Sequence, residues 1–384
     1  MKNRGGYMMK IGITCYPSIG GSGIVATELG LQLAKRGHEI HFIASETPYR
    51  LNDASHNIYT HRIDVTSYNV FKYPPYDITL ANKIANVIDE YELDVIHMHY
   101  AVPHAICGIL AKQIAKRDIK IVTTLHGTDI TILGQDLSLK SAIKFGIEES
   151  DVTTSVSDSL KRDTYELINP EVDIQTIFNF IDEEKFNYLD ASIRKEMRQR
   201  YHIDEGTTVV IHASNFREIK RIDDILRAFK LASEQVDMIL VLAGDGPLSS
   251  KMKALATELE IRHKVLFVGQ QPHIGMYYLM SDIFMLLSEK ESFGLSLLEA
   301  MNCGLVPIGS NAGGIPEVIK HEETGFIVDV HDYKKASEYM VKLSRDNALR
   351  DHLKHAALRD VGERFNSTKI IDQYEVMYKQ LLGD

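Results

Sequence analysis

Two glutamates, Glu291 and Glu299, lie on either side of a Phe-Gly pair, with seven residues between them. A carboxylate accepts several hydrogen bonds at once, so this spacing suits a ligand that carries hydroxyl groups, such as a sugar or a ribose. The apolar run at residues 283–287 predicts a buried parallel strand, and the residues from 294 onward predict an amphipathic helix. In open α/β sheets, ligands bind beyond the carboxyl ends of strands, where helix N-terminal amides attract anions. The alternative for Glu299 is a solvated residue on a helix surface.

A glycine-rich loop at residues 17–23 follows a first predicted strand at 10–16 and precedes a predicted helix at 24–36. Its glycines would let backbone amides approach a phosphate or a carboxylate closely at the helix N-terminus. The loop lacks the G-x-G-x-x-G pattern, and no acidic residue ends the next strand, which disfavours a nicotinamide cofactor. A tight turn without a ligand is the alternative.

Three histidines lie on or after predicted strands. His97 and His99 share one face of the strand at residues 94–100, where they could ligate a metal. Because no third ligand lies nearby in the sequence, we expect these two side chains to make hydrogen bonds instead. His126 follows the strand at 119–125 and precedes a glycine, which places it at a carboxyl edge where functional residues gather.

The whole chain alternates predicted strands and helices, which indicates an α/β fold of two domains for its 384 residues. We place the boundary near residue 180, giving a first domain at 9–180, a second at 181–366 and a C-terminal helix within 367–384. The strands expected in the second domain are at residues 208–213, 238–243, 265–268, 283–287, 306–310 and 326–328.

Composition excludes several classes of function. The net charge of −10 and the pI of about 5.9 argue against general nucleic-acid binding, which needs a basic face. No polybasic or long apolar stretch indicates stable membrane association, and no signal peptide is evident. The three cysteines are far apart and form no C-x-x-C pair, which indicates a reducing cytoplasm and provides no metal framework. The sequence leaves open the oligomeric state, including a homodimer, and whether residues 1–8 are native.

The Glu-x₇-Glu pattern around Phe-Gly, together with the Gly-Gly-Ile-Pro-Glu segment at residues 313–317, resembles the signature of retaining glycosyltransferases of family four. That resemblance implies the GT-B architecture, in which two Rossmann-like parallel-sheet domains face each other across a cleft. It also implies that the C-terminal helix crosses back to the first domain. The donor-binding residues that it implies are Gly20, Gly21, Gly23, Asn215, Arg217, Gly269, Gln270, Phe293, Gly294, Leu295 and Glu299.

By the same resemblance, His126, Lys220 and Glu291 are the catalytic residues. Lys220 would neutralise the departing diphosphate, Glu291 would bind hydroxyls of the donor sugar, and His126 would face that sugar. Front-face attack would retain the anomeric configuration, with the departing phosphate taking the acceptor's proton. The family's clamp arginine falls on Asn215, so either Arg217 or backbone donors would replace its charge.

No D-x-D pair follows a strand, so the resemblance implies a transferase that needs no metal and no cofactor. We expect Asp223 and Asp224, which lie within a helical pattern, to be surface residues. Asp245 follows a strand, and its side chain is expected to brace its own loop.

The segments at residues 15–30, 71–77 and 124–131 are similar to those of family members that transfer N-acetylglucosamine from UDP-GlcNAc to the hydroxyl of L-malate, the first step of bacillithiol biosynthesis. A dianionic acceptor needs hydrogen-bond donors and cations, and the candidates in the first domain are Ser22, Arg50, Tyr100 and Thr128. Three alternatives remain: an α-glycosyltransferase acting on a lipid or polysaccharide, a UDP-GlcNAc 2-epimerase, and a sugar-nucleotide binding module without activity.

Overall fold

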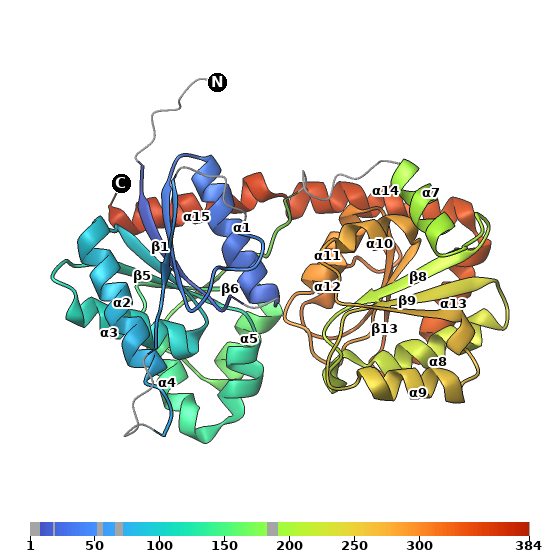
Figure 1. The fold of residues 1–384 in the computed structure, drawn as a ribbon, viewed down its shortest axis with the longest axis horizontal. Helices are drawn as coiled ribbons and strands as arrows, with labels where there is room; N and C mark the ends of the chain where they lie inside the picture. The colour runs from blue at the N-terminus through green and yellow to red at the C-terminus, as the bar shows by residue number, and fades with distance from the viewer. Residues whose placement is uncertain (1–7, 18–19, 52–56, 66–71, 183–190, 384) are drawn as a thin grey trace. The chain divides into compact units, whose positions relative to one another are not determined.

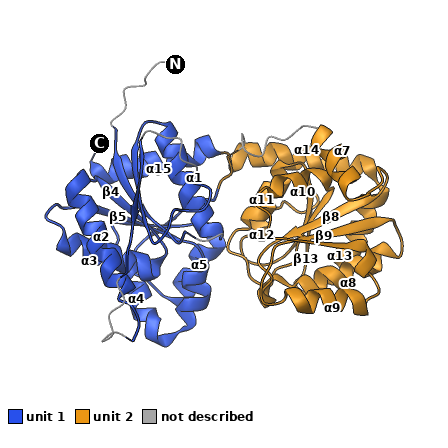
Figure 2. Ribbon diagram, viewed as in Figure 1, with its two compact units in different colours: residues 1–179, 367–384 blue, residues 180–366 orange. Residues whose placement is uncertain are grey.

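The computed structural model describes residues 8–17, 20–51, 57–65, 72–182 and 191–383. The chain forms two compact units, which Figure 2 colours separately. Unit 1 contains residues 1–179 and 367–384, and unit 2 contains residues 180–366. The expectations for residues 1–7 and for parts of the segments 47–76 and 182–206 lie outside the described residues.

Unit 1 contains a seven-stranded parallel sheet with the strand order β3-β2-β1-β4-β5-β6-β7. The order reverses between β1 and β4, which in open α/β sheets is the point where ligands bind, beyond the carboxyl ends of the strands. The strands are β1 (Lys10–Thr14), β2 (Glu39–Ala44), β3 (Ile58–Arg62), β4 (Val95–His99), β5 (Lys120–Leu125), β6 (Val152–Ser155) and β7 (Ile174–Thr176).

The two faces of this sheet have different partners (Figure 1). On one face, Ile96 and Met98 of β4 belong to an apolar core with helices α2 and α3. On the other face, His97 of β4 contacts the C-terminal helix α15 through Tyr378. The helices and helical turns of unit 1 are α1 (Gly21–Lys35), α2 (Tyr76–Tyr91), η1 (Ala101–Ala105), α3 (Ile106–Ile114), η2 (Thr128–Ile132), η3 (Leu133–Gln135), α4 (Leu137–Glu148), α5 (Asp158–Leu167) and α15 (Ser367–Leu382).

Unit 2 contains a six-stranded parallel sheet with the order β10-β9-β8-β11-β12-β13, which reverses between β8 and β11. Its strands are β8 (Thr208–Ala213), β9 (Met238–Ala243), β10 (Val265–Gly269), β11 (Ile283–Leu286), β12 (Val306–Ser310) and β13 (Phe326–Val328). The helices and turns around it are α7 (Ala191–Arg200), η4 (Glu218–Lys220), α8 (Ile222–Ser233), α9 (Ser249–Glu258), η5 (Arg262–Lys264), α10 (Ile274–Met280), α11 (Leu295–Asn302), α12 (Ile315–Val318), α13 (Tyr333–Arg345) and α14 (Asn347–Arg364).

The six strands expected in the second domain are confirmed to within one residue at each end. The start of the first helix is wrong: α1 begins at Gly21, so the last glycines of the expected loop form its first turn. The cap residue, Gly20, has no side chain that could accept a hydrogen bond from the first turn, so the usual sequence signal for a helix start is missing.

Candidate functional site

The sequence-predicted site residues fall into two groups, one in each unit. In each unit they follow strands on both sides of the point where the strand order reverses. Each group is therefore at the edge of its own sheet where Rossmann-like folds bind ligands.

A salt bridge joins the two residues of unit 2 for which catalytic charges were expected. The Nζ atom of Lys220 lies 2.7 Å from Oε2 of Glu291, and the two side chains are only 15% and 16% exposed. Lys220 ends the turn η4 after β8, whereas Glu291 lies in the segment after β11. The amide of Glu289 donates to the carbonyl of Ile219 at 2.8 Å and ties these two segments together. The fold thus pairs a cation and a carboxylate that are 71 residues apart in the sequence.

The elbow between β11 and α11 depends on Gly294. Its φ of +96° is in the left-handed region, which glycine adopts without steric cost, and α11 begins at the next residue, Leu295. The side chain of Phe293 packs edge-on against Phe365 with the ring centroids 5.5 Å apart, so it belongs to the core. The site can therefore use the backbone amides of Phe293, Gly294 and Leu295 but not the phenyl ring.

Two glycines after β12 pack closely against the backbone of this elbow. A Cβ atom on Gly313 would lie 1.9 Å from the carbonyl oxygen of Glu291, and one on Gly314 would lie 2.4 Å from that of Ser292. The amide of Gly314 also donates to the Glu291 carbonyl at 2.8 Å. The Gly-Gly pair is therefore required by close backbone packing, and it fixes the position of Glu291.

Glu299 lies in the second turn of α11 and is 5% exposed. The alternative of a solvated surface residue is wrong for this side chain. Nearly buried carboxylates in folded proteins are hydrogen-bonded, so the protein holds this side chain in a defined position in α11.

Asn215 and Arg217 lie on the loop after β8 and are both exposed. Arg217 makes no ion pair with any residue that the structure describes, so its guanidinium is available to an anion. A Cβ atom on Gly244, the residue after β9, would lie 1.8 Å from the Ser214 carbonyl oxygen, and the amide of Gly244 donates to the Gly269 carbonyl at 2.7 Å. The loop after β8 and the turn at Gly269 are thus connected through one tight backbone contact.

The two expectations for aspartates in unit 2 had different outcomes. Asp245 is confirmed as a loop brace, because its carboxylate accepts a hydrogen bond from the amide of the next residue at 2.8 Å. Surface exposure is wrong for Asp224, which is buried 2.9 Å from Nε of Arg221 and 3.3 Å from Nδ1 of His331. Its neighbour Asp223 is partly exposed and also pairs with Arg221.

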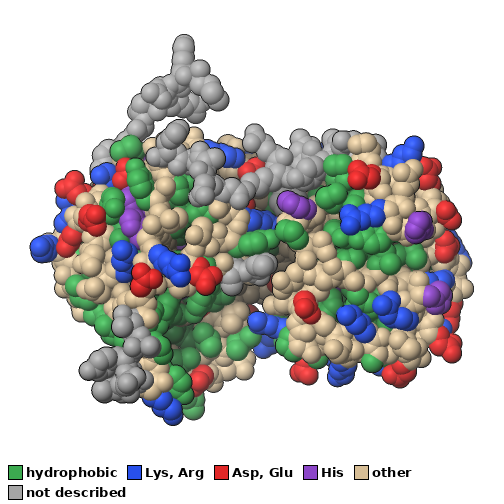
Figure 3. All heavy atoms as spheres, viewed as in Figure 1, with side chains coloured by type: hydrophobic (Ala, Val, Ile, Leu, Met, Phe, Trp, Pro, Cys, Tyr) green, Lys and Arg blue, Asp and Glu red, His purple; other side chains and the backbone are tan. Residues whose placement is uncertain are grey.

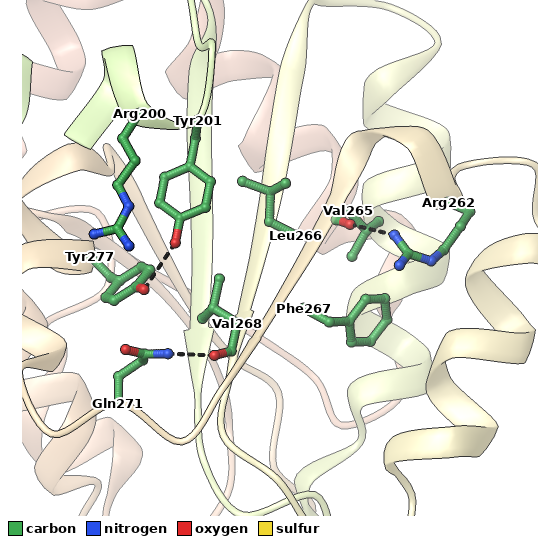
Figure 4. Close-up of a pocket in the computed structure, with 9 residues that line it drawn as sticks. All are labelled: Arg200, Tyr201, Arg262, Val265, Leu266, Phe267, Val268, Gln271 and Tyr277. Atoms are coloured by element: carbon green, nitrogen blue, oxygen red, sulfur yellow. Dashed lines mark hydrogen bonds between the residues drawn. The ribbon is translucent and has the colours of Figure 1, made fainter. Parts of the chain in front are cut away.

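A separate hollow of about 510 Å³ lies along β10, the edge strand of the unit 2 sheet (Figure 4). The hydroxyls of Tyr201 and Tyr277 are 3.0 Å apart within it. Gly269 and Gln270 do not line this hollow, although Val268 before them and Gln271 after them do. Its lining residues are Arg200, Tyr201, Arg262, Val265, Leu266, Phe267, Val268, Gln271 and Tyr277.

In unit 1, the N-terminus of α1 provides backbone amides that have no hydrogen-bond partner among the described residues. The first amides of a helix have no partner within it, and here these belong to Gly21, Ser22 and Gly23. The cap residue, Gly20, makes no side-chain hydrogen bond, and the first turn contains no acidic residue. Gly21 is exposed, and a Cβ atom there would meet no described atom within 4 Å, so the first residue of the helix is open.

Arg50 lies in a turn beside the end of β1. The amide of Tyr49 donates to the carbonyl of Pro17 at 3.3 Å, which holds the turn against the segment that leads to α1. Arg50 itself has a φ of +71°, an uncommon conformation for a residue with a side chain. The structure therefore brings Arg50 to the same edge of the sheet as the α1 N-terminus.

Tyr100 directly follows β4 and has a strained backbone, with φ at +98°. Strain of this kind costs about 1–3 kcal/mol and is found mainly at functional sites. Its amide donates to the Thr124 carbonyl at 3.0 Å, and its own carbonyl accepts from Ala105 at 3.1 Å, so both sides of the residue are held. Its ring centroid lies 5.4 Å from that of Tyr16 and 5.5 Å from that of His126.

His126 begins a loop that Asp129 organises. The buried Asp129 carboxylate accepts hydrogen bonds from the amides of Ala101 at 3.1 Å, His126 at 3.2 Å and Gly127 at 2.8 Å. Burial raises the pKa of Asp129 in spite of these bonds. Thr128 is exposed at the start of η2. One carboxylate thus positions the segments after β4 and after β5 together.

The expectation that His97 and His99 make hydrogen bonds is confirmed. Both ring nitrogens of His97 are engaged, Nδ1 with the hydroxyl of Tyr378 and Nε2 with that of Thr124, each at 2.7 Å. Nδ1 of His99 lies 2.8 Å from Nε2 of His126. Within the described part of the chain, no group of three side chains has the arrangement of a metal site.

Both halves of the chain match known glycosyltransferase families. Residues 19–185 match the family model for glycosyltransferase family 4, and residues 193–360 match that for glycosyl transferases group 1. A curated relative, N-acetyl-alpha-D-glucosaminyl L-malate synthase of Bacillus anthracis, is 51% identical over 98% of both chains. The chain belongs to the same glycosyltransferase family as this relative.

Solved structures resemble the glycosyltransferase along nearly its whole length. Sucrose-phosphate synthase from Thermosynechococcus elongatus has a TM-score of 0.83 and 21% identity, covering 98% of this chain and 99% of its own. Anabaena HepE, solved with UDP-glucose, has a TM-score of 0.82 and 19% identity, covering 97% and 100%. At these identities the likeness shows the fold, which is GT-B with two parallel-sheet α/β domains.

Several residues of the candidate site were not predicted from the sequence. Tyr16 contacts Tyr100 and lies 4.6 Å from His104, measured between ring centroids. Asp129 lies within the segment 124–131 that carries the family resemblance, and an aspartate two residues after a glycine at a strand end is a common loop brace. The role of His104 depends on contacts within the folded chain, so no local pattern indicated it.

The surface adds two observations about the enzyme. On the face shown in Figure 3, acidic and basic side chains of the described residues are interspersed. No helix in the described residues is long and apolar enough to span a membrane.

Proposed function

We propose that this glycosyltransferase transfers N-acetylglucosamine from UDP-GlcNAc to the hydroxyl group of L-malate, releasing UDP and retaining the α configuration, as the first step of bacillithiol biosynthesis. The observation that carries this proposal is the 51% identity to the malate synthase of Bacillus anthracis over nearly the whole of both chains. The three widely spaced cysteines support a reducing compartment such as the cytoplasm.

In this proposal unit 2 binds the donor. Lys220 provides the cation for the diphosphate, with Arg217 or Asn215 on the same loop as a second donor. Glu291 accepts hydrogen bonds from sugar hydroxyls, and Glu299 accepts them from the ribose. The amides at the start of α11 hold the sugar and phosphate, and the turn at residues 269–270 borders the uracil.

Unit 1 binds the acceptor and provides His126. L-Malate carries two carboxylates, which suit the free amides at the N-terminus of α1 and the guanidinium of Arg50. Ser22, Tyr100 and Thr128 supply further hydrogen-bond donors.

The reaction balances without a protein nucleophile. The bond between C1 of the sugar and the β-phosphate oxygen breaks, and the malate hydroxyl oxygen forms the new bond to C1 on the same face. The malate proton passes to the departing phosphate oxygen. Lys220 stabilises the charge that develops on the diphosphate, a role that a metal ion performs in other transferases.

The test is UDP release from UDP-GlcNAc in EDTA, with and without L-malate, followed by the anomeric coupling of the product by NMR. Malate-dependent release of UDP with an α product supports the proposal, including its independence of metal. Release with only a lipid or sugar acceptor would overturn the malate assignment. Conversion of UDP-GlcNAc to its 2-epimer without UDP release would identify an epimerase instead.

A further inference from the structure

Four histidines gather at the carboxyl edge of the unit 1 sheet. The rings of His97 and His99 stack with their centroids 4.4 Å apart, and those of His99 and His126 are 5.1 Å apart. Nδ1 of His104 contacts the backbone carbonyl of His99. His97, His99 and His104 are fully buried. Burial lowers the pKa values of His97, His104 and His126 to about 3, 4 and 3, and it lowers that of His99 well below its ordinary value. These rings are therefore neutral at pH 7, and each has a single N–H.

The position of the proton on His104 follows from its partner. A carbonyl oxygen only accepts hydrogen bonds, so Nδ1 of His104 carries the hydrogen that it donates to the His99 carbonyl. Its Nε2 is then a bare lone pair, and this atom is buried without a partner among the described residues. Nε2 of His104 is thus an unpaired buried ring acceptor.

The contact between His99 and His126 can be formed in two ways, because one ring must donate and the other must accept. If Nε2 of His126 donated, Nδ1 of His99 would accept, and the hydrogen of His99 would be on its Nε2. That Nε2 is buried and has no hydrogen-bond partner among the described residues. Orphaned buried N–H groups are rarer than orphaned acceptors, which favours the opposite arrangement.

From these contacts we infer that His99 is a positioning residue that donates from its Nδ1 to Nε2 of His126 and so keeps the hydrogen of His126 on Nδ1. His126 is then a neutral hydrogen-bond donor toward the substrate and not a general base. This inference rests on the proposed function for the role of His126 toward substrate, but the proton positions follow from unit 1 alone. The ring of His97, held on both nitrogens, stacks on His99 and restrains its plane.

The direct experiment is long-range ¹H–¹⁵N correlation of the histidine-labelled enzyme at pH 7, with the ring of His126 assigned from a His126→Gln sample. The expected pattern is that of a neutral ring protonated at Nδ1. A neutral Nε2–H pattern or a charged ring would overturn the inference. This readout needs no substrate, so it is independent of which acceptor the enzyme uses.

Kinetics give a second readout with whichever acceptor proves active. His99→Leu removes the N–H that donates to His126 and is expected to lower kcat on the order of 10- to 100-fold, with little change in KM for the sugar nucleotide. A loss of this size is typical when a residue that orients a metal-binding histidine is removed. His99→Asn keeps an N–H at the same position and should recover most of that loss. His41→Gln is the matched control, because His41 is also a buried histidine on the unit 1 sheet, paired with Glu39 and His61. Wild-type kcat in a folded His99→Leu enzyme, or equal losses in His99→Leu and His41→Gln, would contradict the inference.

Discussion

Replacing Lys220 by methionine tests the centre of the donor site. The ammonium lies 2.7 Å from the Glu291 carboxylate. At an effective dielectric constant of about 20, this separation corresponds to roughly 6 kcal/mol of gross Coulomb attraction. Desolvation of the lysine offsets part of it, but the replacement leaves the nearly buried Glu291 carboxylate without its cation, so the free energy of unfolding should fall by about 3 kcal/mol. Turnover should fall on the order of 10²- to 10³-fold, because the leaving diphosphate loses its fixed cation.

A double-mutant cycle with Glu291→Gln separates two roles for the lysine. If Lys220 only positions Glu291, the double variant should be no slower than the slower single variant. If Lys220 also stabilises the diphosphate, as we propose, the double variant should be slower than either single one. Lys220→Arg should keep part of the activity, because the charge is retained.

The assay is steady-state UDP release, with chemical denaturation measured on the same samples. Lys320→Met is the control, because Lys320 forms a 2.7 Å ion pair with the buried Asp360 elsewhere in unit 2. It should lose stability without losing kcat. A folded Lys220→Met enzyme with kcat within about 3-fold of wild type would refute the assignment of Lys220 to the leaving group.

Three further outcomes are expected. Gly313→Ala should destabilise unit 2 by more than about 2 kcal/mol and abolish turnover, because its Cβ would lie 1.9 Å from the carbonyl oxygen of Glu291. The control is Gly362→Ala, where a Cβ meets nothing within 4 Å, and this variant should be neutral or stabilising in thermal melts. Arg50→Ala should raise KM for L-malate without changing KM for UDP-GlcNAc, and an unchanged malate KM would remove Arg50 from the acceptor site. Burial lowers the pKa of His212 to about 4. As the pH falls below 6.5, the unfolded chain therefore binds a proton at this histidine before the folded chain does, and stability is lost toward pH 4. His212→Gln should reduce the slope of the unfolding free energy against pH by up to about 1.4 kcal/mol per pH unit between pH 6 and 4.

Local sequence pattern was sufficient to place the strands of unit 2 and insufficient for the order of those strands or for the pairing of side chains. Buried parallel strands are short apolar runs bounded by polar residues, and for this reason strands such as β8 and β12 could be placed closely from the sequence. Asp224 was misplaced because an acidic residue in a helical first turn is usually solvated. Its partners depend on the left-handed backbone of Arg221 and on His331, which is 107 residues away.

The candidate site shows the same division. Motif resemblance indicated Glu291 and Lys220 separately, but their ion pair arises from the order of the strands, which no local pattern contains. The Gly-Gly segment at 313–314 was useful only as a family marker until the backbone contact with Glu291 gave it a physical reason. The proton positions within the histidine cluster require the geometry of the folded unit.

The location of α15 has a consequence for the order in which the enzyme folds during synthesis. Unit 2 is continuous in the sequence, whereas unit 1 needs residues 367–384, which leave the ribosome after all of unit 2. Until then, the buried His97 lacks the hydroxyl of Tyr378, and His38 lacks the carboxylate of Glu375 that lies 2.8 Å from it. Domains usually fold from the N-terminus as they emerge. Unit 1 begins to emerge first, but we expect it to complete its core last. Nascent unit 1 is therefore the part of the chain that depends most on protection from aggregation.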